Sequence, residues 1–219
     1  MPVPPQLPRL VRALPLLLWA VTYVSAAPVP RYATIDEAIA RGDLPDVRTH
    51  IAADPTVVTH SSKGGWPLHQ AILRNKTEIA LFLLECGASV DVADRTQRTP
   101  LHLAVERANV ALVTTLLERH ARPNERDATG WTPLHHAAAG NKIAVARALL
   151  AGGADPKILS ERGGTPLHEA AASGGGEMIR LLLEAGVDPQ VVSKGGVTAL
   201  DIARQFKNEA AIEALSPRD

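Results

Sequence analysis

The sequence repeats itself every 33 residues, and this period constrains the fold more than any other feature. The motif Thr-Pro-Leu-His starts at Thr99, Thr132 and Thr165, a variant starts at Trp66, and a weakened copy starts at Thr198. A fixed period without insertions indicates that one structural unit is used again and again. Because each unit buries its apolar face only against its neighbours, we expect a stack of repeats.

Each repeat is predicted to contain two helices. A threonine before a proline is typical of a helix start, because threonine accepts hydrogen bonds from free N–H groups and proline fits the first helical position. The histidine then falls at the third helical position, from which its side chain can reach back toward the cap. The second helix carries apolar residues at helical spacing, as at Ile79, Leu83 and Leu84. The pattern therefore predicts an all-α fold.

Glycines predict where the helices end and the chain turns. The second helices should stop at Gly87, Gly153 and Gly186. We expect a positive φ in the turn before each first helix, at Gly64, Gly130, Gly163 and Gly196. Gln97 and His120 stand where the other repeats have glycine, and Trp66 stands where they have the capping threonine.

These motifs resemble the ankyrin repeat over about residues 33–215. The resemblance rests on the Thr-Pro-Leu-His-x-Ala stretches and on the Leu-Glu-x-Gly segments that begin at Leu84 and Leu183. It implies a curved solenoid of about six helix–loop–helix repeats, each followed by a β-turn finger. We assign residues 33–217 to this domain, with degenerate terminal repeats as caps, and residues 27–32 to a short linker.

Residues 1–26 have the pattern of a secretory signal peptide. Arg9 and Arg12 precede a mostly apolar run over residues 13–24, and small residues follow up to Ala26. The run is shorter than the roughly 20 residues that span a bilayer. We expect cleavage after Ala26, no membrane span in the mature chain, and a periplasmic protein in a bacterium or otherwise a secreted one. An uncleaved anchor, which would make a membrane-tethered adaptor, and a cytosolic protein are the alternatives.

Composition and motifs argue against several classes of function. Lys and Arg number 23 and Asp and Glu number 23, so there is no basic excess for nucleic acid. Cys86 is the single cysteine, which excludes an intrachain disulfide and leaves an inert thiol or an intermolecular disulfide. Asn75 begins an Asn-x-Thr sequence that is a glycosylation acceptor only outside bacteria.

Catalytic and metal sites are not predicted. One histidine recurs per repeat, but packed helices lie about 8–10 Å apart, which is too far for successive histidines to share a zinc ion. Glycines 174–176 lack the Gly-Lys-Ser/Thr continuation of a phosphate-binding loop, and no Gly-x-Ser-x-Gly elbow occurs. We therefore predict that the chain is not an enzyme and binds no metal and no cofactor.

Variable positions within the constant repeat predict the binding surface. In ankyrin-like proteins, partners bind the finger tips and the exposed face of the first helices, so we predict a non-catalytic, monomeric protein–protein interaction module. Trp131 and Arg98 should form the centre of an interface with an acidic partner, unless Trp131 is a lid over its neighbouring finger. An inhibitor or immunity-like protein and a scaffold of an envelope enzyme are both consistent with this. The candidate residues are Arg74, Arg95, Arg98, Arg107, Trp131 and Arg162.

Overall fold

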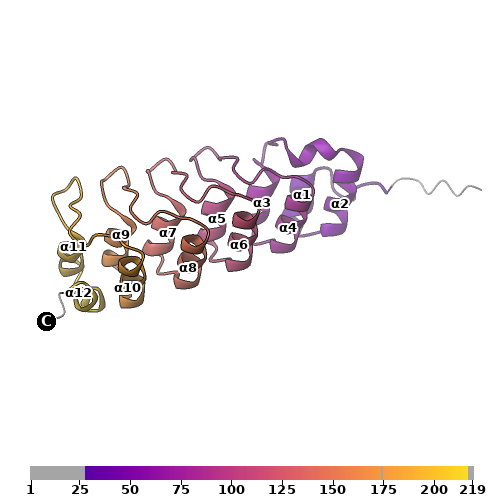
Figure 1. Ribbon diagram of the computed structural model, residues 1–219. Coiled ribbons are helices and arrows are strands. Elements are labelled where there is room, and N and C mark those ends of the chain that lie inside the picture. Colours follow the sequence, from indigo (N-terminus) through magenta and orange to yellow (C-terminus); the bar gives the residue numbers. More distant parts are fainter. Residues whose placement is uncertain (1–27, 174, 217–219) are drawn as a thin grey trace, which may run out of the picture.

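The computed structural model describes residues 28–173 and 175–216, so the predicted signal peptide lies outside the described residues. Over these residues the chain forms twelve α-helices in six consecutive pairs, one short 3₁₀ helix and no β-strand. Figure 1 shows the pairs stacked side by side along one axis, with a finger-like turn beyond each first helix from α5 to α11. The predicted all-α solenoid is confirmed. In chain order the helices are α1 (Ile35–Arg41), α2 (Leu44–Ala53), η1 (Pro55–Val58), α3 (Pro67–Leu73), α4 (Thr77–Glu85), α5 (Pro100–Glu106), α6 (Val110–Glu118), α7 (Pro133–Ala139), α8 (Ile143–Ala151), α9 (Pro166–Ser173), α10 (Gly176–Glu184), α11 (Ala199–Gln205) and α12 (Glu209–Leu215).

The first helices start as the motif predicts. Thr99 caps α5, and the His102 ring at the third helical position completes a capping box by accepting from the Thr99 N–H at 3.2 Å. The same arrangement caps α7 with Thr132 and His135. Trp66 makes no side-chain hydrogen bond at the start of α3. This difference leaves the free N–H groups of α3 without the cap that the other repeats have.

The turn glycines follow the prediction at three of four positions. Gly130, Gly163 and Gly196 have φ of 75°, 76° and 76°. The prediction for Gly64 is wrong, because the positive φ falls at Gly65, at 99°. The turn of this finger is one residue shorter than that of the later fingers. Here the Ser62 N–H donates to the carbonyl of Gly65, three residues on, whereas the Asp127 N–H donates to the carbonyl of Trp131, four residues on. The non-glycine residues Gln97 and His120 adopt φ of 63° and 65°.

The core is a continuous layer of leucine and alanine between repeats. Each first helix packs on the first helix of the next repeat, as α5 does on α7, and α6 packs on α8 in the layer of second helices. Leu134, Leu167, Ala137 and Ala170 are fully buried. Small residues on the first helices let neighbouring repeats approach closely, which is why a chain with 3% aromatic residues can fill its core. No helix among the described residues is long and apolar enough to cross a membrane.

Candidate interaction surface

Two faces of the stack differ in how they are built. We call the finger turns together with the exposed sides of α3, α5, α7, α9 and α11 the finger face, and Figure 1 shows the second helices on the side away from the finger tips. The residue just before each capping position, here called the finger-base residue, joins finger to helix. The finger-base residues of repeats two to six are Gly65, Arg98, Trp131, Gly164 and Val197.

An aspartate fixes the shape of two fingers. Asp94 Oδ1 accepts hydrogen bonds from the N–H groups of Thr96 at 2.7 Å and Arg98 at 3.0 Å. Asp127 Oδ1 accepts from the N–H groups of Thr129 at 2.8 Å and Trp131 at 3.0 Å. Burial alone would raise the pKa of Asp127, but hydrogen bonds from the Thr129 hydroxyl, His136 and the two N–H groups lower it to about 2. The finger-base residues therefore leave rigid turns in fixed directions.

The recurring histidines tie the first helices α5 and α7 to the next finger. Because His102 and His135 accept at Nδ1, Nε2 carries the proton and donates to the carbonyl of Trp131 and of Gly164, both at 3.2 Å. Burial lowers the pKa of both rings to about 4, so they are neutral at pH 7. No group of three or more His, Cys, Asp or Glu side chains able to hold a metal occurs in the described part of the chain.

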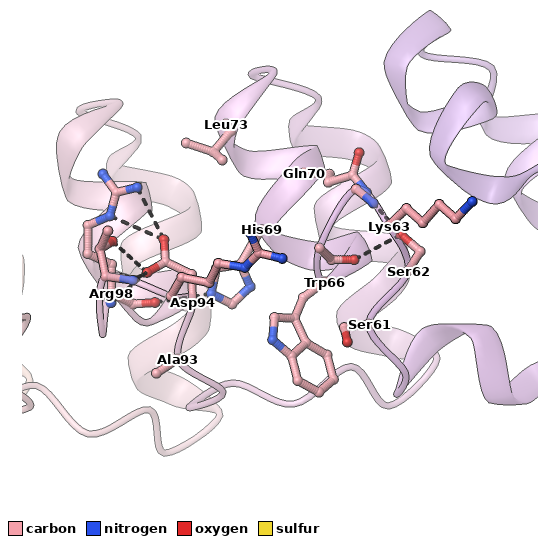
Figure 2. Close-up of a pocket in the computed structure, with 14 residues that line it drawn as sticks. Ser61, Ser62, Lys63, Trp66, His69, Gln70, Leu73, Ala93, Asp94 and Arg98 are labelled. Carbon is pink, nitrogen blue, oxygen red and sulfur yellow. Dashed lines mark hydrogen bonds and ion pairs between the residues drawn. The ribbon is translucent and has the colours of Figure 1, made fainter.

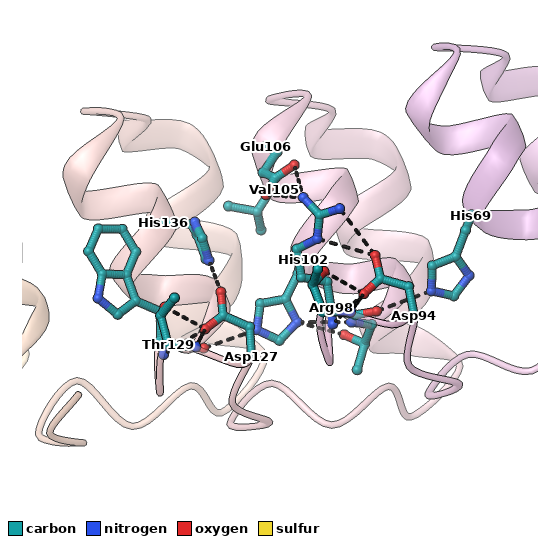
Figure 3. A network of polar contacts seen from close by, with 12 residues as sticks. His69, Asp94, Arg98, His102, Val105, Glu106, Asp127, Thr129 and His136 are labelled. Carbon is teal, nitrogen blue, oxygen red and sulfur yellow. Dashed lines mark hydrogen bonds and ion pairs between the residues drawn. The ribbon is translucent and has the colours of Figure 1, made fainter. Parts of the chain in front are cut away.

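Arg98 folds back over its own repeat. Its guanidinium lies 3.1 Å from Asp94 in the finger and 3.1 Å from Glu106 at the end of α5. The Lys142 ammonium of the next repeat donates to the last carbonyls of α5, those of Val105 at 3.0 Å and Glu106 at 2.9 Å. Figure 3 shows the ion pairs of Arg98 with Asp94 and Glu106 between the finger base and the first helix. Arg98 therefore already has two carboxylate partners within the protein.

Trp131 occupies the same place one repeat further on. Its ring lies 5.0 Å from the His136 ring, edge to face, and 6.2 Å from the His135 ring. His136 Nε2 is 2.8 Å from the Asp127 carboxylate, which joins helix α7 to the base of the finger. The indole is partly exposed beside this network. Trp131 thus contacts its own first helix while part of its ring is available at the finger face.

The other four predicted residues have free charges at the surface. Arg74, Arg95, Arg107 and Arg162 are exposed and form no ion pair among the described residues. Arg95 shares a finger with Arg98, whereas Arg162 lies two repeats further along. Arg74 and Arg107 cap the C-terminal ends of α3 and α5. The six candidates therefore do not form one cluster; they are distributed over repeats two to five.

A groove of about 550 Å³ opens between the second and third fingers. Figure 2 shows the Trp66 indole and the His69 ring in this groove, with Asp94 and Arg98 at its other end. The Lys63 and Arg95 side chains are exposed there without a carboxylate partner in the described chain. His69 is 3% exposed, and its Nδ1 has no hydrogen-bond partner among the residues that the structure describes, because Trp66 replaces the threonine. The groove is lined by Lys63, Trp66, His69, Gln70, Arg95 and Thr96, among others.

A second groove of about 650 Å³ opens between the fifth and sixth fingers. Its walls come from the finger base at Gly164, from α9 and α11, and from Phe206 at the end of α11. Glu169 lines this groove, and its carboxylate makes no ion pair among the described residues. Sequence reasoning missed Lys63, Glu169 and Phe206, and the glycines among the finger-base residues were the signal that could have indicated both grooves.

Cys86 and Asn75 lie apart from these grooves. Cys86 follows the last turn of α4 and is partly buried, and burial raises the pKa of its thiol. A raised thiol pKa lowers the fraction of reactive thiolate at pH 7. Asn75 is exposed in the loop between α3 and α4, with φ of 55°. Glycosylation at Asn75 and an intermolecular disulfide at Cys86 stay predictions.

Stacked helix pairs with intervening fingers define a helical-repeat solenoid. The chain matches the family model described as ankyrin repeats (three copies). The matches cover residues 35–127, 68–160, 109–193 and 141–219. These overlapping matches cover most of the chain, and the protein belongs to the ankyrin repeat family. Comparison with curated proteins found no match. Ankyrin repeats are generally protein–protein interaction modules and are typically not catalytic.

Proposed function

We propose that this protein binds an acidic protein partner through its finger face. The carrying observation is the set of exposed cations that have no carboxylate partner within the described part of the chain: Lys63, Arg95 and Arg162 in the fingers, with Arg74 and Arg107 at the ends of α3 and α5. Surface cations that make no internal ion pair are available to steer and hold a negatively charged partner. The partly exposed Trp66 and Trp131 add aromatic surface of the type that is enriched at binding hot spots.

The internal network supports this proposal because it makes the face rigid. Asp94 and Asp127 fix two finger turns, and His102 and His135 hold the next finger base to the preceding first helix. A rigid surface loses little conformational entropy when a partner binds. Trp131 remains at the centre of the proposed interface, with Arg98 acting there as a positioned and partly neutralised cation.

We also propose that the protein is exported, on the strength of the signal-like composition of residues 1–26. Its role would then be that of an inhibitor or immunity-like protein, or of a scaffold for an envelope enzyme. Cleavage predicts that the native protein begins at Ala27, which N-terminal sequencing and intact mass measure directly. A native protein that retains Met1 contradicts cleavage, and fractionation of the cells then separates a membrane-tethered adaptor from a cytosolic protein.

Charge reversal tests the binding proposal. The full native chain, wild type or with Lys63→Glu and Arg95→Glu together, is used to capture partners from the envelope fraction. Both residues are exposed, so the double variant should fold normally yet lose the partner that the wild type retains. Arg180→Glu is the matched control, since Arg180 is an exposed arginine on the second helix α10 and should not affect capture. Equal capture by the wild type and the double variant would refute the proposed face.

A further inference from the structure

The two middle fingers cover their own first helices with a large finger-base residue. In the third repeat, Arg98 reaches the carboxylate of Glu106 on α5 at 3.1 Å. In the fourth repeat, the Trp131 ring lies 5.0 Å from the ring of His136 on α7. The fifth repeat has Gly164 at this position, so no side chain extends from the finger base over α9. The groove between the fifth and sixth fingers occupies this space.

The Glu169 carboxylate faces the space that Gly164 leaves open. A Cβ atom placed on Gly164 would lie 3.8 Å from Glu169 Oε1 and 3.3 Å from the Cβ of His168. His168 is 3% exposed and lines the same groove; burial lowers the pKa of its ring, and backbone hydrogen bonding at Val197 and Val191 opposes this effect. Glu169 is thus a carboxylate directed toward an open groove.

The surroundings of Glu169 favour a cation with an apolar stem. Burial raises the pKa of the Glu169 carboxyl, and Arg162 opposes this effect without forming an ion pair. Ala172, Val197 and Ile202 line the groove, and Phe206 at its edge is 61% exposed. The rim of the groove also carries the charged residues Glu161, Arg162 and Lys194. A carboxylate beside apolar groups is poorly solvated, so a cation that also covers those groups stabilises its charged form.

We propose that this groove receives an arginine side chain of the partner protein, which pairs with Glu169 and stacks on Phe206. The proposal rests on the proposed function and adds a second contact of opposite charge to the basic groove at Lys63 and Arg95. Arginine fits better than lysine because its planar guanidinium binds a carboxylate with two hydrogen bonds and stacks on aromatic rings. The partner's arginine would supply to the fifth repeat what Arg98 supplies to the third.

Peptide selection tests this inference without knowledge of the partner. The probe is a phage-displayed library of random 12-residue peptides, selected on the immobilised full chain. The wild type should enrich two groups of peptides: acidic ones and ones that carry arginine next to apolar residues. Glu169→Gln, which is nearly isosteric, should weaken the arginine-bearing peptides by about tenfold or more, because a charge-assisted hydrogen bond is lost. It should leave binding of the acidic peptides unchanged.

Gly164→Arg is the second variant. Gly164 has an ordinary φ and its added Cβ meets only one tight contact, so the backbone admits a side chain there. The new arginine should pair with Glu169 from within the chain and exclude the arginine-bearing peptides. Replacing the peptide arginine by citrulline, which is uncharged, should have the same effect.

The outcomes separate the inference from the proposed function. Enrichment of acidic peptides without arginine-bearing ones would refute the inference and leave the proposed function intact. Arginine-bearing peptides that bind both variants as tightly as the wild type would also refute the inference. If the wild type enriches no peptide while Lys63→Glu with Arg95→Glu still captures the native partner, both proposals are refuted.

Discussion

The buried histidines predict that acid destabilises the fold by a calculable amount. The pKa of His135 falls from 6.5 to about 4 because the ring is buried. The unfolded chain therefore binds a proton below pH 6.5 that the folded chain binds only near pH 4. The stability that the neutral His135 ring contributes is fully present above about pH 6.5, and it is lost as the pH falls from 6.5 to about 4. The full loss is about 3 kcal/mol, of which about 2 kcal/mol should appear between pH 7 and pH 5.

Substitution of His135→Gln isolates this contribution. Glutamine does not titrate in this range, and it loses part of the bonding to Thr132 and Gly164, so the variant should be about 1–3 kcal/mol less stable at pH 7. The stability difference from the wild type should shrink by about 2 kcal/mol at pH 5, because only the wild type loses the histidine contribution. Asp127 is present in both proteins, so its contribution largely cancels.

Urea unfolding followed by circular dichroism at pH 7 and pH 5 measures both differences. A stability difference that is the same at the two pH values would refute the account of His135 as a buried, neutral ring. The same measurement on His102→Gln provides a second test, since the pKa of His102 is also lowered to about 4.

Three substitutions test other parts of the structure. Leu134→Ala removes a fully buried side chain and should lower the free energy of unfolding by about 2–5 kcal/mol. Hydrogen exchange should become faster mainly over residues 100–165, and faster exchange over the whole stack would contradict local coupling between repeats. Trp66→Thr should raise the free energy of unfolding by about 1 kcal/mol, because it restores the cap of α3 and a hydrogen-bond partner for His69. The measurement is a higher Tm, and an unchanged Tm would contradict the destabilisation that we assign to Trp66. Trp131→Ala should weaken partner binding by about 2 kcal/mol or more with little change in Tm, whereas a much lower Tm with normal binding would identify Trp131 as a lid.

The fold was predictable because its rules are local. A threonine, a proline and a histidine in sequence specify a capped helix, and Gly130 and Gly163 specify the turns at fixed spacing. The full helix-start signal recurs in the third, fourth and fifth repeats, so each of these copies supports the assignment of the others. The prediction of a positive φ at Gly64 was wrong because the turn of the second finger is shorter. This turn begins one residue later than the 33-residue register indicates.

The candidate site was less predictable because it depends on contacts between finger and helix. Arg98 reaches Glu106 eight residues away across the finger base, and no helical or turn spacing indicates this pair. Both grooves lie beside a glycine finger-base residue, Gly65 or Gly164. Glycine has no side chain to fill the space over the first helix, so the groove stays open. A sequence pattern identifies variable positions, but whether a variable side chain binds its own protein or a partner depends on the distance between elements.

Hydrogen exchange of the partner-bound protein tests the central claim most directly. The full chain captures its native partner, and mass spectrometry then compares the hydrogen exchange of this protein in the complex with that of the free protein. We predict protection of the fingers and first helices, chiefly over residues 61–73, 93–107 and 126–139, with the second helices α4, α6 and α8 unchanged. Protection confined to those second helices would contradict binding through the finger face.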